Sequence, residues 1–189
     1  MRKQHWLPGN TKVEVPGYMV FVDTESKIVP FTDNIDRHTL WFGSAIFIHA
    51  RTKKNRSWLH EETFEFTTPG EFWNWLESKT YNRTKLYVYA HNWNYDAGIL
   101  ALATLPKLNG WECTGYINDK PPFIMTLKKG TKVIQFIDTL NYFPTSLKAL
   151  GESIGSYKLE YPKEDATAAE WKEYNIQDSR VIKDAVLAL

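Results

Sequence analysis

The sequence lacks most of the features that mark secreted and membrane proteins. Its 189 residues contain one cysteine, Cys113, which excludes an internal disulfide and a cysteine-rich zinc site. No apolar run approaches the roughly 18–20 residues that span a bilayer, and the N-terminus has no apolar signal segment. We therefore expect a soluble protein without a membrane partner, in an intracellular, cytoplasmic setting that is viral, plasmid-borne or bacterial.

An excess of charge of one sign is also lacking. The chain has 23 Lys and Arg against 22 Asp and Glu, so bulk basicity does not indicate nucleic-acid binding. Repeats, low-complexity segments and long linkers are absent from the sequence as well. With 43% hydrophobic residues the chain is able to bury one sizeable core. We expect a single domain over residues 1–189, with any polyanion held by a local site.

Several stretches have the alternating or continuous apolar pattern of strands. The stretch 85–90 reads as a central strand because it is short and almost wholly apolar. The tip "KKGTK" separates two alternating runs and so predicts a hairpin. The predicted strands cover residues 17–25, 39–49, 62–66, 85–90 and both arms of the hairpin at 121–138.

Helices are predicted in three places. Thr68 with Glu71, and Thr167 with Glu170, have the spacing of capping boxes at helix N-termini. The second of these helices continues with apolar residues at helical spacing to the last residue. Residues 94–105 are rich in helix formers. Strands mixed with helices in this order predict an α/β sheet covered by helices.

Two acids in the first predicted strand raise a functional question. Asp23 and Glu25 project from the same face of a strand, directly after the apolar run "MVFV". One interpretation is a solvated face or pairing with lysines. The apolar context favours another, because two buried carboxylates repel each other and a divalent cation between them removes that repulsion.

Two further acids occur where ligands are expected. Asp96 follows strand 85–90, at the strand end where sites in open α/β sheets lie. Asp178 shares one face of the last helix with Tyr174, four residues earlier. Taken singly, each has a structural alternative: an acid at a helix N-terminus, a solvated helix acid, and a half-buried helix aromatic. Their order along the chain is far more specific.

The segments "DTE", "HNWNYD" and "YNIQD" resemble, in that order, the three motifs of the DEDDy 3′–5′ exonucleases of the ribonuclease H-like superfamily. The segment "TLNYF" at 139–143 is similar to a motif of the proofreading domain of protein-primed family B DNA polymerases. The resemblance runs from about Gly17 to the C-terminus. It implies a ribonuclease H-like mixed sheet flanked by helices, and stepwise removal of nucleotides from the 3′ end of single-stranded DNA.

The resemblance also implies two divalent cations, Mg²⁺ or Mn²⁺, roughly 4 Å apart, one activating water and the other stabilising the departing 3′ oxygen. Asp23 would bridge both ions, and Glu25 and Asp178 would complete the first site. Asp96 would hold the second ion. Oxygen ligands of this kind suit hard cations.

Three other side chains have roles implied by the same resemblance. Tyr174 would position the attacking water by its hydroxyl, without acting as a strong base, since a free phenol titrates near 10. Lys158 would act on the scissile phosphate. Lys163 is a rival for that role, because the spacing to the last motif varies.

Six residues are implied to contact or stabilise the terminal nucleotides of the single strand. For Tyr95 and Leu140, packing in the core is an open alternative. Trp93 lies in the same segment, and we predict that it packs on the sheet instead of stacking on a base. The six residues are Thr24, His91, Asn92, Tyr95, Thr139 and Leu140.

Several functional alternatives stay open at this point. The 189 residues contain no counterpart of the polymerase region of the resembling enzymes, so both a free-standing enzyme and a proofreading domain with a polymerase partner fit. RNA is an alternative substrate to DNA. A non-catalytic single-strand-binding module of the same fold would have no need of the acids. An endonuclease or integrase of this superfamily would leave Tyr174 and the His91-Asn92 pair without a role.

Overall fold

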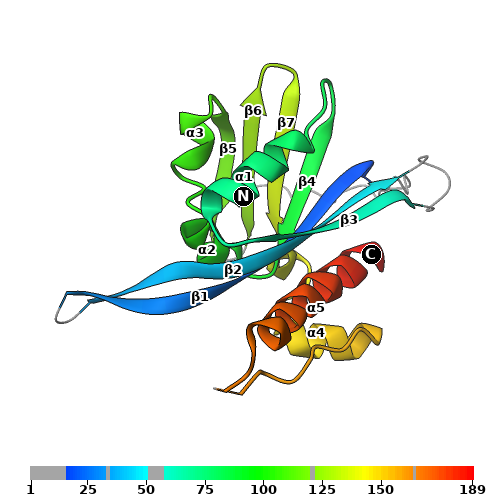
Figure 1. The fold of residues 1–189 in the computed structure, drawn as a ribbon. Coiled ribbons are helices and arrows are strands. Elements are labelled where there is room, and N and C mark those ends of the chain that lie inside the picture. Colours follow the sequence, from blue (N-terminus) through cyan, green and yellow to red (C-terminus); the bar gives the residue numbers. More distant parts are fainter. Residues whose placement is uncertain (1–15, 33–34, 51–57, 120–121, 164) are drawn as a thin grey trace, which may run out of the picture.

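The computed structural model describes residues 16–32, 35–50, 58–119, 122–163 and 165–189. Seven strands form one mixed sheet in the order β3-β2-β1-β4-β7-β6-β5 (Figure 1). The strands are β1 (Tyr18–Thr32), β2 (Ile35–Ala50), β3 (Trp58–Phe66), β4 (Lys85–Ala90), β5 (Glu112–Asn118), β6 (Phe123–Lys129) and β7 (Lys132–Asp138). The predicted α/β class and the hairpin around residue 130 are confirmed.

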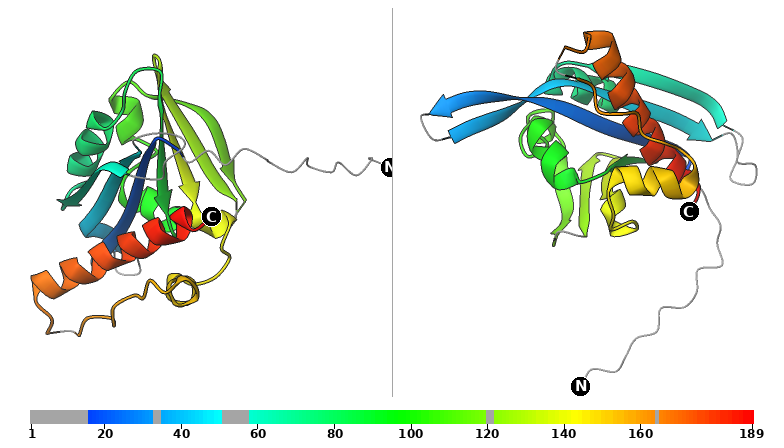
Figure 2. Two further views of the ribbon diagram at one scale, coloured as in Figure 1. Left: turned by 90° about the vertical axis from the view of Figure 1, so that its right-hand side faces the viewer. Right: turned by 90° about the horizontal axis from the view of Figure 1, so that it is seen from below.

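Helices cover both faces of the sheet. Helices α1, α2 and α3 lie on one face, and α4 and α5 lie on the other (Figure 2). Both predicted capping boxes are present, at Thr68 and at Thr167. Among the described residues, no helix is long and apolar enough to cross a bilayer. The helices are α1 (Pro69–Ser78), α2 (Trp93–Ile99), α3 (Leu105–Leu108), α4 (Leu147–Ile154) and α5 (Ala168–Leu187), with a 3₁₀ turn η1 (Thr139–Asn141).

Successive side chains of β1 point to opposite faces of the sheet, and this decides on which face each functional side chain lies. Val20 and Val22 belong to the core cluster under α1, whereas Met19 and Phe21 belong to the cluster under α4 and α5. Continuing this alternation sends the side chains of Asp23 and Glu25 toward α5 and that of Thr24 toward α2.

In the parallel part of the sheet, the ends of β4 and β7 lie at the same edge as the end of the β1 segment that pairs with β4. In the β1–β4 pair Phe21 is opposite Tyr89, and in the β4–β7 pair Ala90 is opposite Asp138. Carboxyl ends of neighbouring parallel strands meet at the same edge. The residues after Val22, Ala90 and Ile137 are therefore adjacent in space although they are far apart in sequence.

Strands β1 and β2 are longer than the predicted 17–25 and 39–49. Beyond Ser26 and Leu40 they pair only with each other and project from the body as a two-stranded arm, residues 26–32 and 35–40 (Figures 1 and 2). Pro30 argues against a strand because it cannot donate a backbone hydrogen bond. In a two-stranded ribbon each strand has one unpaired edge, so this missing donor is tolerated.

The predicted helix over 94–105 is wrong in its length. Helix α2 ends at Ile99, and Ala101 has a left-handed φ of 51°. This reversal lets both Leu100 and Leu102 pack in the core. In a continuous helix, Leu100 and Leu102 would point to different sides, because they are two positions apart. The strand β5, the helices α3 and α4 and the turn η1 are not predicted by the pattern above.

Candidate functional site

Three of the predicted carboxylates meet between β1 and α5. Asp23, Glu25 and Asp178 each offer one oxygen, and these three oxygens lie within 4.8 Å of one another. Asp178 is buried, and the two strand acids are half-buried. The structure therefore brings together residues from opposite ends of the chain, as the order of the motifs predicts.

Ionisation of the three carboxyl groups is unfavourable in this cluster, and their pKa values are raised. Burial, with the nearby charge of Asp178, raises the pKa of Glu25 to about 7. Burial raises the pKa of Asp178 to about 6, although the Lys158 ammonium opposes the shift. The pKa of Asp23 is raised well above its usual value, first by burial and then by the acids around it. A bound cation would offset each of these effects.

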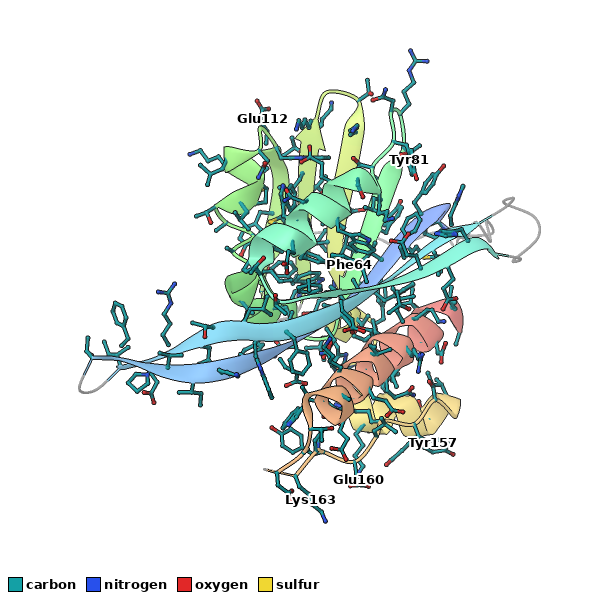
Figure 3. All side chains as sticks on the ribbon, viewed as in Figure 1. Phe64, Tyr81, Glu112, Tyr157, Glu160 and Lys163 are labelled. Atoms are coloured by element: carbon teal, nitrogen blue, oxygen red, sulfur yellow. The ribbon has the colours of Figure 1, made fainter. Side chains whose placement is uncertain are left out.

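Lys158 reaches this cluster from the loop before α5. Its Nζ lies 2.6 Å from Asp178 Oδ2 and 5.0 Å from the centre of the Tyr174 ring. Burial alone would lower the pKa of Lys158, but the hydrogen bond and attraction to Asp178 outweigh it and raise the pKa. Lys163 is exposed and lies farther along the same loop. In Figure 3 it is labelled below Tyr157 and Glu160.

Tyr174 and Asp178 lie on one face of α5, as their spacing predicts. Tyr174 is 7% exposed and packs edge-on against Tyr161 and Trp171. Burial raises the pKa of its phenol, although the hydrogen bond with Lys158 opposes the shift. The hydroxyl therefore keeps its proton at neutral pH.

Asp96 is buried in the first turn of α2, outside the three-oxygen cluster. Thr24 Oγ1 donates a hydrogen bond to Asp96 Oδ1 at 2.5 Å. Burial raises the pKa of Asp96 to about 7, even though this hydrogen bond opposes the shift. Its negative charge also contributes to the raised pKa of Asp23, so the two carboxylates are electrostatically linked.

Two of the predicted substrate residues bind each other. Burial lowers the pKa of His91, so its imidazole is neutral at pH 7. His91 Nε2 donates to the carbonyl of Thr145 at 2.9 Å, and Nδ1 is hydrogen-bonded to the Thr139 hydroxyl at 2.8 Å. This contact joins the ends of β4 and β7. Asn92 is exposed beside it and has a left-handed φ of 81°.

Tyr95 is 40% exposed, so packing in the core does not account for it. Its hydroxyl is hydrogen-bonded to Ser26 and to His38 Nδ1, which lie at the root of the arm. Leu140 is half-buried in η1. Trp93 is fully buried and donates from Nε1 to the carbonyl of Ile137, which confirms that it packs on the sheet.

Sequence reasoning missed Asp138 at the end of β7. Its Oδ1 accepts from the backbone N–H of Asn92 and of Leu140, and its Oδ2 accepts from that of Trp93. The buried carboxylate therefore stabilises the N-terminus of α2 and the turn η1 together. The available signal was like the one that singled out Asp96, namely an acid at or shortly after the carboxyl end of an apolar strand.

A second missed residue is Asn175, inside the segment "YNIQD". Its Nδ2 donates to Asp23 Oδ2 at 2.6 Å, and the residue is fully buried. Contact between positions 152 residues apart has no local signature in the sequence.

The donor set of the cluster fits a hard divalent cation. Within the described part of the chain, no hydrogen-bond donor reaches Asp178 Oδ1, which is buried. A buried carboxylate oxygen without a partner is costly, and a cation would satisfy it. All the ligand atoms on offer are carboxylate oxygens, the kind that Mg²⁺ and Mn²⁺ prefer.

No family model and no curated protein sequence matches this chain. Solved structures of the Phi29 DNA polymerase do match it. Its orthorhombic crystal form has a TM-score of 0.62 at 16% identity, and its complex with single-stranded DNA has 0.59 at 18% identity. Each match covers 92% of this chain and 31% of the polymerase chain. At this identity the likeness establishes the fold, which is α/β and ribonuclease H-like.

Proposed function

We propose that this protein is a metal-dependent 3′–5′ exonuclease that removes nucleotides from single-stranded DNA, and that residues 1–189 act as one domain. The observation that carries the proposal is the convergence of Asp23, Glu25 and Asp178, with Lys158 and Tyr174 beside them. The fold likeness to a DNA polymerase, one of whose structures contains single-stranded DNA, gives further support. That likeness fits both a free-standing enzyme and a domain that works with a polymerase.

Asp23, Glu25 and Asp178 would hold one divalent ion, and Asp96 would help to hold a second. When bound, Mg²⁺ or Mn²⁺ supplies Lewis-acid stabilisation of the charge that develops on the scissile phosphate and its leaving oxygen. The raised pKa values of the carboxyls mean that they take up protons easily without metal. Cation binding is therefore expected to release protons near neutral pH.

The roles of Tyr174 and Lys158 follow from their contacts. The Tyr174 hydroxyl keeps its proton and would orient the attacking water by hydrogen bonding. The Lys158 ammonium stays charged and lies against both Tyr174 and Asp178. It would place positive charge next to the phosphate while holding Tyr174 in position.

The strand ends next to the cluster would hold the terminal nucleotides. Tyr95 offers an exposed ring on which a base can stack, and Asn92 offers an exposed amide. Thr24, His91, Thr139 and Leu140 would contact the strand or shape its binding surface. Because Thr24, His91 and Thr139 are engaged within the protein, we expect them mainly to fix the positions of Asp96, Asn92 and Leu140.

The test is hydrolysis of a 5′-labelled single-stranded DNA by the purified chain, with Mg²⁺ or Mn²⁺ and with a chelator. Stepwise shortening that needs metal is expected. Asp23→Asn should slow it by at least about 100-fold, because it removes a ligand charge while keeping the shape of the side chain. Asp165→Asn, an exposed change on the loop before α5, is the matched control and should leave the rate unchanged.

Other outcomes identify the alternatives. Retention of the strand without cleavage would indicate a single-strand-binding module, and internal cuts would indicate an endonuclease. Faster shortening of an RNA of the same sequence would make RNA the substrate. Wild-type rates in Asp23→Asn would contradict the metal assignment.

A further inference from the structure

Among the described residues, the side chain of Asn175 makes the one side-chain hydrogen bond to the Asp23 carboxylate. Its Nδ2 lies 2.6 Å from Asp23 Oδ2. The opposite orientation of the amide would set its oxygen against a carboxylate oxygen, and both are acceptors. The amide therefore has a single favourable orientation, with the donor toward Asp23.

Hydrogen bonds hold the backbone of Asn175 against β2, the strand that pairs with β1 at Asp23. Ser44 on β2 is the cross-strand partner of Asp23. Ser44 Oγ donates to the backbone carbonyl of Asn175 at 3.2 Å, and Ser179 Oγ donates to the backbone carbonyl of Ser44 at 3.1 Å. All three residues of this network, Ser44, Asn175 and Ser179, are buried. The position of the amide relative to Asp23 is thus set by the packing of α5 on the sheet.

Stability alone does not explain an asparagine at this position. Its Oδ1 is buried, and no partner for it exists among the residues that the structure describes. A buried carbonyl without a hydrogen bond is costly, and an apolar side chain of similar size would avoid this cost. The feature that an apolar side chain would not reproduce is the hydrogen bond to Asp23.

We propose that Asn175 is a positioning residue that fixes the orientation of the Asp23 carboxylate for cation binding. A carboxylate has about four lone-pair sites, and the amide of Asn175 occupies one of them. The remaining sites stay available for the cation shared with Glu25 and Asp178. This inference rests on the metal site of the proposed function. It assigns to Asn175 a role in metal affinity and no contact with the reacting atoms.

The test is the dissociation constant of Mn²⁺ measured by calorimetry without DNA, together with the melting temperature in a chelator. Asn175→Leu keeps a similar volume and removes the amide. We expect its Mn²⁺ dissociation constant to rise about 10- to 100-fold, the range typical of residues that orient metal ligands. We expect its melting temperature without metal to stay close to that of the wild type.

Asn109→Leu is the matched control, because Asn109 caps α3 away from the cluster by donating to the carbonyl of Leu105. It should leave Mn²⁺ affinity unchanged. Asn175→Ala is a second, smaller variant in case leucine does not fit. Unchanged Mn²⁺ affinity in either folded variant of Asn175 would overturn the proposal. Failure of both variants to fold would also overturn it, by making Asn175 a requirement of the fold.

The two proposals fail in distinguishable ways. If the wild-type chain does not bind Mn²⁺, the proposed function fails and this inference fails with it. If the wild type binds Mn²⁺ and hydrolyses DNA while Asn175→Leu binds the ion equally well, only the inference about Asn175 fails.

Discussion

At the scale of single residues, the site is an arrangement of buried and half-buried acids with one lysine beside them. Asp178 has Lys158 on one oxygen and, within the described residues, no partner on the other. Tyr174 lies under the same lysine and keeps its proton. These contacts give the two residues different expected roles. Asp178 would hold a cation, whereas Tyr174 would act only on the attacking water.

Tyr174→Phe tests this difference in roles. The change removes one hydroxyl and keeps the ring that packs against Tyr161 and Trp171. We expect the rate of hydrolysis to fall about 10- to 100-fold, because a hydroxyl that orients the water is lost. Single-turnover kinetics measure this rate. Calorimetry with Mn²⁺ and fluorescence anisotropy with labelled DNA should give nearly wild-type affinities. An unchanged rate would make Tyr174 a packing residue only.

At the scale of elements, short segments at strand ends are held in place by each other. Helix α2 has seven residues, and its N-cap Asn92 makes no capping hydrogen bond with its own side chain. The carboxylate of Asp138 replaces that cap from the end of β7 and at the same time holds η1. The positions of Asp96, His91 and Leu140 therefore depend on Asp138.

Asp138→Ala is expected to destabilise the protein by about 3 kcal/mol, because it leaves three backbone donors, including the buried N–H of Trp93, without their acceptor. For a chain of this size, that corresponds to a fall of about 6–12 °C in melting temperature. Thermal denaturation followed by circular dichroism measures the effect. Asp165→Ala, an exposed change, should shift it by less than about 2 °C. A loss below about 1 kcal/mol in Asp138→Ala would mean that α2 and η1 are held by other contacts.

At the scale of the whole molecule, one edge of the sheet collects the ends of β4 and β7 and the end of the segment of β1 that pairs with β4, and α5 crosses the face next to it. Several carboxylates lie close together there, and their mutual repulsion and burial destabilise the folded state. The rest of the fold must compensate for this. The large apolar clusters on the two faces of the sheet provide that stability. Without metal, this destabilisation should appear as a dependence of stability on pH.

We expect the free energy of unfolding in a chelator to fall as the pH rises from about 4.5 to 7. Burial raises the pKa of Glu25 from 4.5 to about 7 and that of Asp178 from 3.8 to about 6. A carboxyl with a higher pKa in the folded state binds more protons when folded, so raising the pH through this window favours unfolding. The pKa of Glu62, lowered to about 2 by its hydrogen bond with Lys79, affects stability only below pH 4.5. His91 acts in the opposite sense below pH 6.5, because burial lowers its pKa.

Melting temperatures in a chelator at pH 4.5 and pH 7.5 measure this dependence. After a discount for the partial exposure of Glu25, we expect a loss of about 1–2 kcal/mol, or about 2–8 °C, at the higher pH. Mn²⁺ should restore stability at pH 7.5. Glu25→Gln should reduce the loss, because it removes one of the titrating groups while His91 is unchanged. Equal losses in the wild type and in this variant would contradict the assignment.

The sequence by itself determined the capping boxes at Thr68 and Thr167, the hairpin of β6 and β7, and the class of the fold. Capping and hydrophobic periodicity act between residues a few positions apart, so they can be read locally. The order of the acidic motifs also predicted that Asp23, Glu25 and Asp178 would meet, through their resemblance to a known set of motifs.

Only the tertiary structure decided the long arm, the end of α2 at Ile99 and the contacts of Asp138 and Asn175. The arm forms because pairing between β1 and β2 overrides the local preference of Pro30. The hydrogen bonds of Asp138 and Asn175 span 46 and 152 positions in the sequence. Whether a buried polar side chain finds its partner depends on how distant segments pack, and no local pattern carries that information.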